Sequence, residues 1–407
     1  MKNNYSNLMF LSKRITSFQE EFITPRQNGK YLVLGKVTNS NSILLSSCDY
    51  LSISGHPDIV NAQTEMLKKS KDSVIMSAIF LQGDNPQTNF EKKMASFVGY
   101  EASILCQSGW AANVGLIQSI ASKEIPVYID FLAHMSLWEG VKSSEATAYP
   151  LIHNDVSHLE KLIKINGEGV IIVDSVYSTN GSVCPLLEIV EIAERYGCVL
   201  VVDESHSLGT HGPNGRGMVV GLGLTDRVHF ITASLAKAFA GRAGIILCSK
   251  QFANYFPFVS FPAIFSSSLL PYEIIGLSTT IDVIEKADDK RKQLFYNSNY
   301  LRIGLDKLGY NVSNGEEQII SLESGSESDT EKLRDALEDR NIFGSVFCYP
   351  ATTKNKSIVR FAVNSKLTQN ELDSILEVCK EIREEVGMFD WKSTKRKKTN
   401  GKLEIAI

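Results

Sequence analysis

Four segments of the sequence place charged or nucleophilic side chains directly after short apolar runs. They are Asp130-Phe-Leu-Ala-His134, Asp174-Ser-Val-Tyr-Ser178, Asp203-Glu-Ser-His206 and Thr232-Ala-Ser-Leu-Ala-Lys237. If the apolar runs are neighbouring parallel strands, the four segments meet at the edge where open α/β sheets bind ligands. A lysine, aspartates and two histidines would then share one site.

Lys237 and Asp203 indicate the chemistry of that site. A partly desolvated lysine amine is a nucleophile toward carbonyl groups, although Lys237 could also extend into water as an ordinary surface residue. A buried carboxylate at Asp203 requires a cation. The protonated ring nitrogen of pyridoxal phosphate supplies that cation, and its aldehyde reacts with a lysine. The pair therefore favours this cofactor.

A phosphate group needs a binding site of its own. Ser108, Gly109 and Trp110 directly precede a helix-forming run. A serine N-cap and the free backbone N–H groups at a helix start bind anions. We therefore expect this segment to hold the cofactor phosphate.

The histidines allow a simpler interpretation. A single histidine near a strand end is usually a structural residue, so position alone leaves His134 and His206 open. His153 and His158 are five residues apart, not the four of a helical ligand pair. The sequence predicts no metal site.

The elements that position these residues follow from apolar patterning. Uncharged, β-branched runs at 169–173, 198–202 and 228–231 predict strands that are buried on both faces. Residues 186–196 have helical apolar spacing and are followed by Gly197, a typical C-cap. We therefore predict an α/β domain with a doubly wound, mostly parallel sheet.

The pattern changes after about residue 285, where a long charged helix leads to short strands and two further helices. The strands are expected at 318–322, 344–348 and 357–363, and the helices near 330–340 and 369–386. This predicts a smaller α+β C-terminal domain. We expect an N-terminal segment (1–55) packing on the small domain, a large cofactor-binding domain (56–285), the small domain (286–390) and a disordered basic tail (391–407).

Composition excludes several classes of protein. The 407 residues include 42 Lys plus Arg and 46 Asp plus Glu, a net charge of −4, whereas a nucleic-acid binder needs a basic face. Seven cysteines without a C-x-x-C pair indicate reduced thiols. The first ten residues lack the apolar region of a signal peptide, and the uncharged stretch 255–272 contains three prolines, which makes it a poor membrane span. We expect a cytoplasmic protein.

Taken in order, these segments resemble the α-oxoamine synthases, which are fold-type I pyridoxal-phosphate enzymes that condense an amino acid with an acyl-CoA. The resemblance covers roughly residues 45–386. It rests on DYL (49–51) with HP (56–57), SGWAAN (108–113), HND (153–155), DESH (203–206), GRG (215–217) and FSSSLLP (265–271). Within that family, stretches such as FLAHMSLWEG, HFITASLAKAFA and FGSVFCYPAT are similar to the quorum-sensing autoinducer synthases.

The resemblance implies a role for each matching residue. Lys237 would bind the cofactor aldehyde and move the substrate's α-proton, Asp203 would pair with the pyridine nitrogen, and His206 would hydrogen-bond the ring hydroxyl. His134 would stack on the ring and assist at the acyl carbonyl. Arg360 is the candidate for the substrate carboxylate. The other implied cofactor contacts are Ser108, Gly109, Trp110, Ser178, Ser234 and, from the partner subunit of a homodimer, Ser266 and Ser267.

The resemblance also implies a reaction. A medium-chain fatty acyl-CoA would condense with S-adenosylmethionine or a small amino acid such as 2-aminobutyrate, with loss of carbon dioxide, to give an α-aminoketone precursor of a hydroxyketone signal. A synthase of the 8-amino-7-oxononanoate or 2-amino-3-ketobutyrate CoA ligase type, and a catalytically silent binding protein of the same fold, are the alternatives. The apolar run 255–265 is either a wall for the acyl chain or a dimer interface.

The sequence departs from the general family pattern in three places. Ser234 and Ala236 stand where most members have Thr and Ser, and the stretch after the lysine reads Gly241-Arg-Ala-Gly244. Ile358 occupies the first position of the usual Arg-x-Arg. The register of the carboxylate-binding arginine is therefore open.

Overall fold

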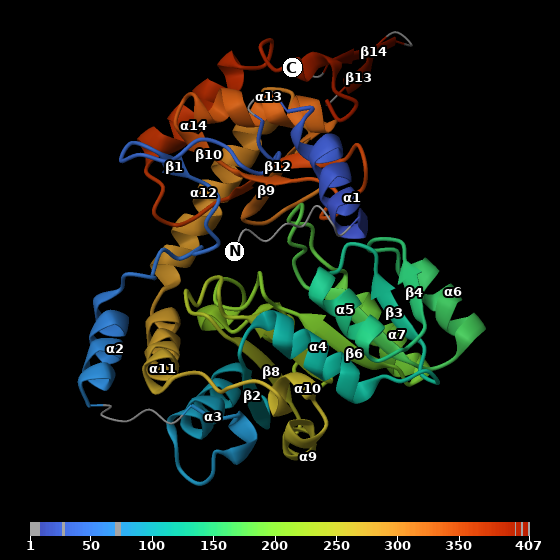
Figure 1. Ribbon diagram of the computed structural model, residues 1–407, viewed down its shortest axis with the longest axis vertical. Coiled ribbons are helices and arrows are strands. Elements are labelled where there is room, and N and C mark those ends of the chain that lie inside the picture. The colour runs from blue at the N-terminus through green and yellow to red at the C-terminus, as the bar shows by residue number, and fades with distance from the viewer. Residues whose placement is uncertain (1–8, 27–28, 70–74, 395, 400–401, 406–407) are drawn as a thin grey trace.

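The computed structural model describes residues 9–26, 29–69, 75–394, 396–399 and 402–405. A seven-stranded sheet forms the centre of the lower lobe in Figure 1, with the order β2-β8-β7-β6-β5-β3-β4. Strands β3 to β7 are parallel, and β8 is antiparallel to both of its neighbours. The predicted doubly wound, mostly parallel sheet is confirmed. Its strands are β2 (Ala102–Cys106), β3 (Val127–Asp130), β4 (Ala148–Leu151), β5 (Val170–Asp174), β6 (Val199–Asp203), β7 (Phe230–Ser234) and β8 (Gly244–Cys248).

Helices cover both faces of this sheet. Within β5, Val170 and Ile172 enter one hydrophobic core and Ile171 and Val173 enter the other, which explains why the strand is apolar throughout. The first core contains α4 (Gly109–Ile120) and α5 (Met135–Ser143). The second contains α3 (Pro86–Val98), α6 (Val156–Asn166), α7 (Leu186–Tyr196) and α11 (Pro271–Glu285).

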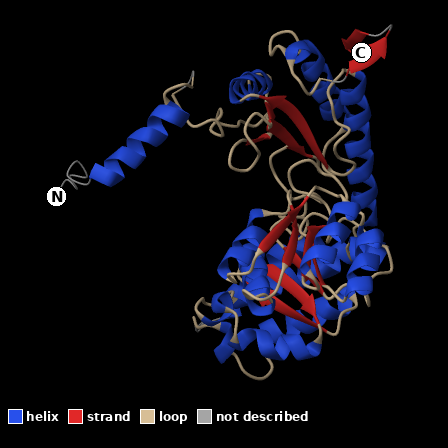
Figure 2. Ribbon diagram, turned by 90° about the vertical axis from the view of Figure 1, so that its right-hand side faces the viewer, coloured by secondary structure: helices blue, strands red, loops and turns tan. Residues whose placement is uncertain are grey.

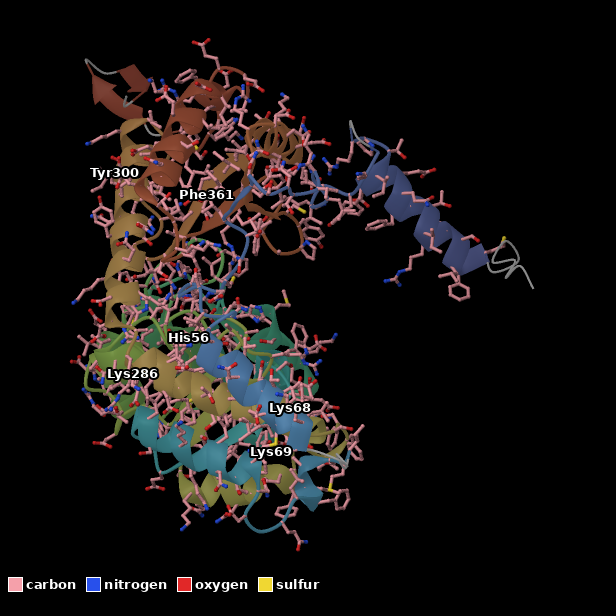
Figure 3. All side chains as sticks on the ribbon, turned by 90° about the vertical axis from the view of Figure 1, so that its left-hand side faces the viewer. His56, Lys68, Lys69, Lys286, Tyr300 and Phe361 are labelled. Carbon is pink, nitrogen blue, oxygen red and sulfur yellow. The ribbon has the colours of Figure 1, made fainter. Side chains whose placement is uncertain are left out.

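The upper lobe contains a three-stranded antiparallel sheet in the order β11-β12-β9. The long helix α12, which carries Tyr300, runs from the lower lobe into this upper lobe, where Phe361 lies in the sheet (Figure 3). The elements are α12 (Asp288–Lys307), β9 (Ile319–Gly325), α13 (Glu327–Glu338), β11 (Ser345–Phe347), β12 (Ser357–Ala362) and α14 (Gln369–Glu381).

The N-terminal segment contacts the upper lobe. Its strand β1 (Ile43–Leu44) pairs in parallel with β10 (Ile342–Phe343), and Arg26 forms an ion pair with Glu327. Helix α1 (Met9–Phe18) has no buried residue and stands clear of both lobes in Figure 2. These contacts place part of the N-terminal segment on the upper lobe, and the domain boundaries stay a prediction.

Two regions differ from the sequence-based expectations. The single charged helix expected near residue 285 is two helices, because α11 ends at Glu285 and α12 begins at Asp288. The tail expected to be disordered includes the buried Trp391, whose ring lies 6.2 Å from that of Tyr310, and two antiparallel strands. Burial of the apolar Trp391 ring holds the start of the tail against the small domain. The sequence Asn-Gly between the two strands is a typical hairpin signal. The strands are β13 (Arg396–Thr399) and β14 (Lys402–Ile405).

The remaining elements are short or peripheral. They are α2 (Pro57–Lys69), α8 (Met218–Gly221), α9 (Lys250–Tyr255), α10 (Phe261–Ile264) and the single turns Gln19–Ile23, Ala78–Phe80, Pro213–Gly215, Phe256–Phe258 and Met388–Asp390. No helix in the described part of the chain is long and apolar enough to cross a bilayer.

Candidate active site

The carboxyl ends of β3, β5, β6 and β7 lie at one edge of the sheet and face two adjoining cavities. A larger cavity, of about 1010 Å³, lies between the lobes and includes Lys237, His134, His206 and Arg360 in its lining. A smaller pocket continues from it toward the sheet. Asp203 and Lys237 both line this smaller pocket, as the pairing predicted from the sequence requires. Its lining is Gly109, Trp110, Asn113, His134, Ser136, Asp174, Asp203, Ser205, His206, Ser234 and Lys237.

Asp203 is a buried carboxylate with neutral hydrogen-bond partners. Its side chain is 3% exposed. One oxygen accepts from the Ser205 backbone N–H at 2.8 Å, and the other accepts from the Asn113 amide at 2.7 Å. No ion pair of Asp203 is found among the described residues, although a buried carboxylate is stabilised by a cation. Its chemistry therefore fits the protonated ring nitrogen of pyridoxal phosphate.

His206 lies next to Asp203 in this pocket and is held from behind by Tyr50. The Tyr50 hydroxyl lies 2.7 Å from Nδ1 of His206, and Tyr50 is fully buried. Burial, followed by the charges of Lys237 and Arg360, lowers the pKa of His206 well below its usual value, so the ring is neutral. The contact with Tyr50 leaves Nε2 as the nitrogen that is available to a ligand.

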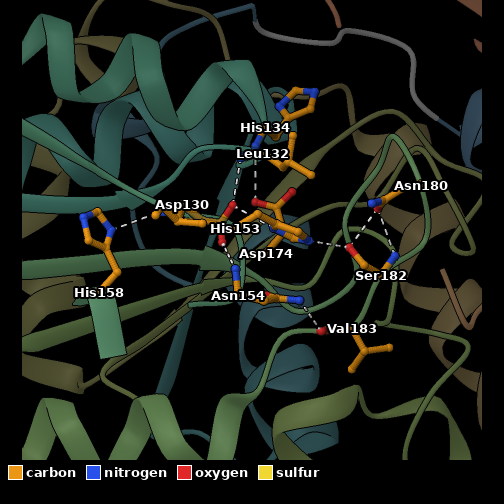
Figure 4. A network of polar contacts seen from close by, with 11 residues as sticks. Asp130, Leu132, His134, His153, Asn154, His158, Asp174, Asn180, Ser182 and Val183 are labelled. Atoms are coloured by element: carbon orange, nitrogen blue, oxygen red, sulfur yellow. Dashed lines mark hydrogen bonds and ion pairs between the residues drawn. The ribbon is translucent and has the colours of Figure 1, made fainter. Parts of the chain in front are cut away.

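His134 begins α5 at the mouth of the pocket. Its backbone N–H donates to Asp174 at 3.2 Å (Figure 4), and its ring meets Trp110 edge to face at 6.5 Å. Burial lowers the pKa of the His134 imidazole, opposed by Asp203 and reinforced by Lys237. Burial and then the charge of Asp203 raise the pKa of Asp174 well above its usual value. Through the bond to His134, Asp174 orients the start of α5.

The start of α4 lies directly against the end of β7. Ser108 caps the helix by accepting from the Ala111 backbone N–H at 3.1 Å. A Cβ at Gly109 would lie 2.6 Å from the Ser234 Cβ, so only glycine allows this approach. The unpaired N–H groups of the first helical turn and the Ser234 hydroxyl thus lie together, an arrangement that binds phosphate.

Arg360 occupies the larger cavity and has an unused donor. Nη1 donates to the Ser178 carbonyl at 2.7 Å, Nη2 lies 3.5 Å from the Cys48 sulfur, and the guanidinium lies 4.5 Å from the centre of the Phe347 ring. Its buried Nε has no hydrogen-bond partner among the described residues. Ser178 thus contributes its carbonyl to Arg360 and lines this larger cavity, not the smaller pocket.

The apolar run 255–265 does not line either cavity, so the interpretation of this run as the acyl-chain wall is wrong for the single chain. Its prolines divide it into short turns that leave Phe258, Phe261 and Phe265 71%, 58% and 79% exposed. Phe131, Met135, Trp138 and Phe347 form the apolar wall of the larger cavity instead.

Ser266 and Ser267 follow this exposed run and also lie outside both cavities of their own chain. The Ser266 hydroxyl donates to the Pro262 carbonyl, and the backbone of Ser267 forms an isolated antiparallel β-bridge with that of Ser77. Their contact with the phosphate of a partner subunit stays a prediction.

A second polar network, shown in Figure 4, resembles a nucleophilic triad without having its chemistry. His153 lies 3.0 Å from Asp130 through Nδ1 and 2.9 Å from the Ser182 hydroxyl through Nε2. Asn180 accepts from the backbone N–H of Ser182 at 3.0 Å through Oδ1, and the Ser182 hydroxyl donates to that same oxygen at 2.8 Å. Asn180 therefore competes with His153 for the single hydrogen of the Ser182 hydroxyl, and Ser182 is buried. This network orders the loop after β5 and does not present a serine to a substrate.

The described residues contain no cluster of three or more metal-ligating side chains. All seven cysteines are free thiols, and Cys48 alone among them is only partly buried. Residues that the sequence analysis did not single out are Tyr50, Asn113 and Ser136, although Tyr50 and Asn113 stand within the matched stretches DYL and SGWAAN.

The doubly wound sheet, with a lysine, a buried aspartate and an anion cradle at its carboxyl edge, defines the fold-type I class of pyridoxal-phosphate enzymes. The family model for aminotransferase class I and II matches residues 40–378. The chain belongs to this family, and the enzyme class and the pyridoxal phosphate cofactor predicted from the sequence are those of its α-oxoamine synthase members.

Individual relatives give a finer picture. CAI-1 autoinducer synthase of Vibrio campbellii is 51% identical over 372 residues, 91% of this chain and 94% of that protein. 8-Amino-7-oxononanoate synthase 1 of Bacillus subtilis is 31% identical over 87% of this chain and 91% of its own. A serine palmitoyltransferase variant of S. paucimobilis, solved with a bound PLP–myriocin aldimine, has the same fold, with a TM-score of 0.84 at 23% identity over 95% of this chain and 100% of that one. The predicted resemblance is confirmed.

Proposed function

We propose that the protein condenses a medium-chain fatty acyl-CoA with S-adenosylmethionine or an amino acid like 2-aminobutyrate, with loss of carbon dioxide. The product is an α-aminoketone precursor of an α-hydroxyketone autoinducer. The observation that carries this proposal is the placement of Asp203 and Lys237 in one pocket, next to a large, mostly apolar cavity. The relative named CAI-1 autoinducer synthase supports the product class.

Each group of the cofactor has a suitable partner in the pocket. Asp203 would hold the ring nitrogen, Nε2 of His206 the ring hydroxyl, and the start of α4 with Ser234 the phosphate. Trp110 and His134 would flank the ring. When bound, pyridoxal phosphate withdraws electrons from the α-carbon of an amino substrate.

The protein's own residues would handle the proton and the two substrates. The Lys237 amine would take the α-proton and return a proton to the product. Arg360 would bind the carboxylate of the amino donor, because this residue is only 6% exposed and keeps Nε unpaired. The wall around Trp138 and Phe347 would receive the acyl chain and exclude water from the reacting carbons.

We also propose that the enzyme is a cytoplasmic homodimer. The exposed phenylalanines of run 255–265 are a surface that a second copy would cover. Ser266 and Ser267, at the end of that run, would then contact the partner's phosphate. The free thiols agree with a reducing compartment.

Replacing Lys237 tests the proposal. The purified protein is mixed with a panel of acyl-CoA donors and amino donors, release of free thiol is followed, and the products are identified by mass spectrometry. Lys237→Ala should lose both turnover and the absorbance of covalently bound cofactor. Lys292→Ala, on the exposed side of α12, is the matched control and should keep both. Appreciable turnover by Lys237→Ala would contradict the proposal.

The same panel separates the alternative functions. A preference for dicarboxylic or short acyl-CoA donors with glycine, alanine or serine would indicate a biosynthetic sibling such as the 31% identical 8-amino-7-oxononanoate synthase. A failure to release thiol from every donor in the panel would indicate a silent binding protein. We expect medium-chain donors to be preferred.

A further inference from the structure

An unbroken chain of hydrogen bonds connects the Asp203 carboxylate to the ring of His134. Oδ2 of Asp203 lies 2.7 Å from Nδ2 of Asn113, and this nitrogen lies 2.8 Å from Oγ of Ser136. Oγ of Ser136 lies 2.8 Å from Nδ1 of His134. The four residues come from β6, α4 and α5 and all line the smaller pocket.

The chemistry of the groups fixes the direction of each bond. A carboxylate only accepts, so Asn113 must turn its NH2 group, and not its carbonyl oxygen, toward Asp203. The second hydrogen of the same NH2 group then goes to Ser136, whose oxygen accepts it. The hydroxyl hydrogen of Ser136 is left for Nδ1 of His134.

A second donor confirms which nitrogen of His134 is unprotonated. The backbone N–H of Ser136 also points at Nδ1, at 3.3 Å, as expected when the residue that starts a helix caps it. Nδ1 thus faces two donors and carries no hydrogen. In a neutral imidazole the hydrogen is then on Nε2.

Burial keeps this chain of bonds intact. Asn113 is 2% exposed, Ser136 is fully buried and Asp203 is 3% exposed, so water does not compete for the intermediate bonds. The Asn113 carbonyl oxygen is buried and has no hydrogen-bond partner among the described residues. The amide is therefore held by its two donated bonds. The lowered pKa of His134 keeps its ring neutral at neutral pH.

We propose that Asn113 and Ser136 are positioning residues that hold His134 in its Nε2–H tautomer and connect that tautomer to the Asp203 carboxylate. The role of this tautomer toward a substrate rests on the proposed function. Nε2–H gives the cavity a neutral hydrogen-bond donor, and a carbonyl or carboxylate oxygen of a substrate accepts from it. The inference itself concerns only residues of this chain.

Nuclear magnetic resonance of the ¹⁵N-histidine-labelled protein without cofactor tests the proposal. His134→Gln identifies the His134 signals. We expect an unprotonated Nδ1 and a protonated Nε2 at neutral pH. In Ser136→Ala the pKa of His134 should rise by about 0.5 to 1, because a donor that favours the neutral ring is removed.

A matched control separates this effect from a general loss of packing. Ser298→Ala also removes the hydroxyl of a buried helical serine, which bonds the Leu294 carbonyl in α12, and should leave the His134 titration unchanged. If Ser136→Ala does not fold, Asn113→Ala is measured and should move the His134 pKa in the same direction.

A hydrogen on Nδ1 of His134 in the wild-type protein would overturn the proposal. So would a folded Ser136→Ala or Asn113→Ala variant in which His134 titrates as in the wild type. Failure of the proposed function has a different signature. A wild-type protein that takes up no pyridoxal phosphate would overturn the function, while the spectra of the cofactor-free protein would still decide the tautomer.

Discussion

Gly109 tests whether the close approach of α4 to β7 forms the phosphate site. An alanine Cβ at this position would lie 2.6 Å from Cβ and 2.8 Å from Cα of Ser234. Carbon atoms pack at about 3.5–4.0 Å, so the start of the helix must withdraw by about 1 Å. The obstacle includes backbone, which cannot rotate away as the end of a side chain could.

The expected loss follows from that displacement. Overpacking of this kind opposes the bound geometry by about 1–3 kcal/mol, which corresponds to an increase of about 5- to 150-fold in the dissociation constant of pyridoxal phosphate. The alanine itself does not weaken the helix, since alanine favours helix over glycine by about 1 kcal/mol. A weaker site would thus reflect the lost approach to Ser234.

The assay is an equilibrium titration of the cofactor-free protein with pyridoxal phosphate, followed by absorbance. Gly55→Ala is the control, because no heavy atom lies within 4 Å of the Cβ it would add. A dissociation constant for Gly109→Ala within twofold of the wild-type value, or an equal loss in Gly55→Ala, would refute the assignment of the phosphate site.

Two further substitutions test the larger cavity and a buried carboxyl. Arg360→Lys should raise KM for the amino donor by about 10- to 100-fold with a smaller change in kcat, because an ammonium cannot keep the bond to Ser178 and also supply the donor that Nε of the arginine leaves free. The comparison is the kinetics with an amine that lacks the carboxylate. An equal loss for both substrates would contradict the role of Arg360 in binding the carboxylate. Burial raises the pKa of Glu91 to about 7 in the folded protein, from a usual value of 4.5. The unfolded chain therefore loses this proton first, and wild-type stability should fall by up to about 3 kcal/mol as the pH rises from about 4.5 through about 7. Urea unfolding measured below and above that pH range gives the free energy of unfolding, and in Glu91→Gln it should no longer fall with pH in this way. If the free energies of the wild type and the variant depend on pH in parallel, Glu91 is not the source of the fall.

Local patterns predicted much of the fold. The helix at 186–196 and its C-cap Gly197 were predicted to the residue, because apolar spacing and a left-handed glycine are properties of adjacent residues. The strands predicted at 169–173 and 198–202 are each displaced by one residue from those observed, and the strand predicted at 228–231 begins two residues later and ends three residues later. The role of the run 255–265 could not be predicted in this way. Its apolar composition indicates that it tends to be buried, but it does not indicate which surface packs against it.

The candidate site shows the same division. Trp110, His134 and Lys237 stand beside strand ends or a helix start, so their types and positions indicated a shared edge. The contact between Tyr50 and His206 joins residues 156 positions apart, and no periodicity in either segment connects them.

By itself, the sequence determined which side chains stand at the ends of buried strands, since alternation, caps and chain direction are encoded locally. Only the tertiary structure decided which of them share a pocket. It selected the hydrogen-bond partners of Asp203 and His134 by packing α4 and α5 against the same face of the sheet. The physical reason is that hydrogen-bond direction depends on distances of about 3 Å between segments that only the packed core brings together.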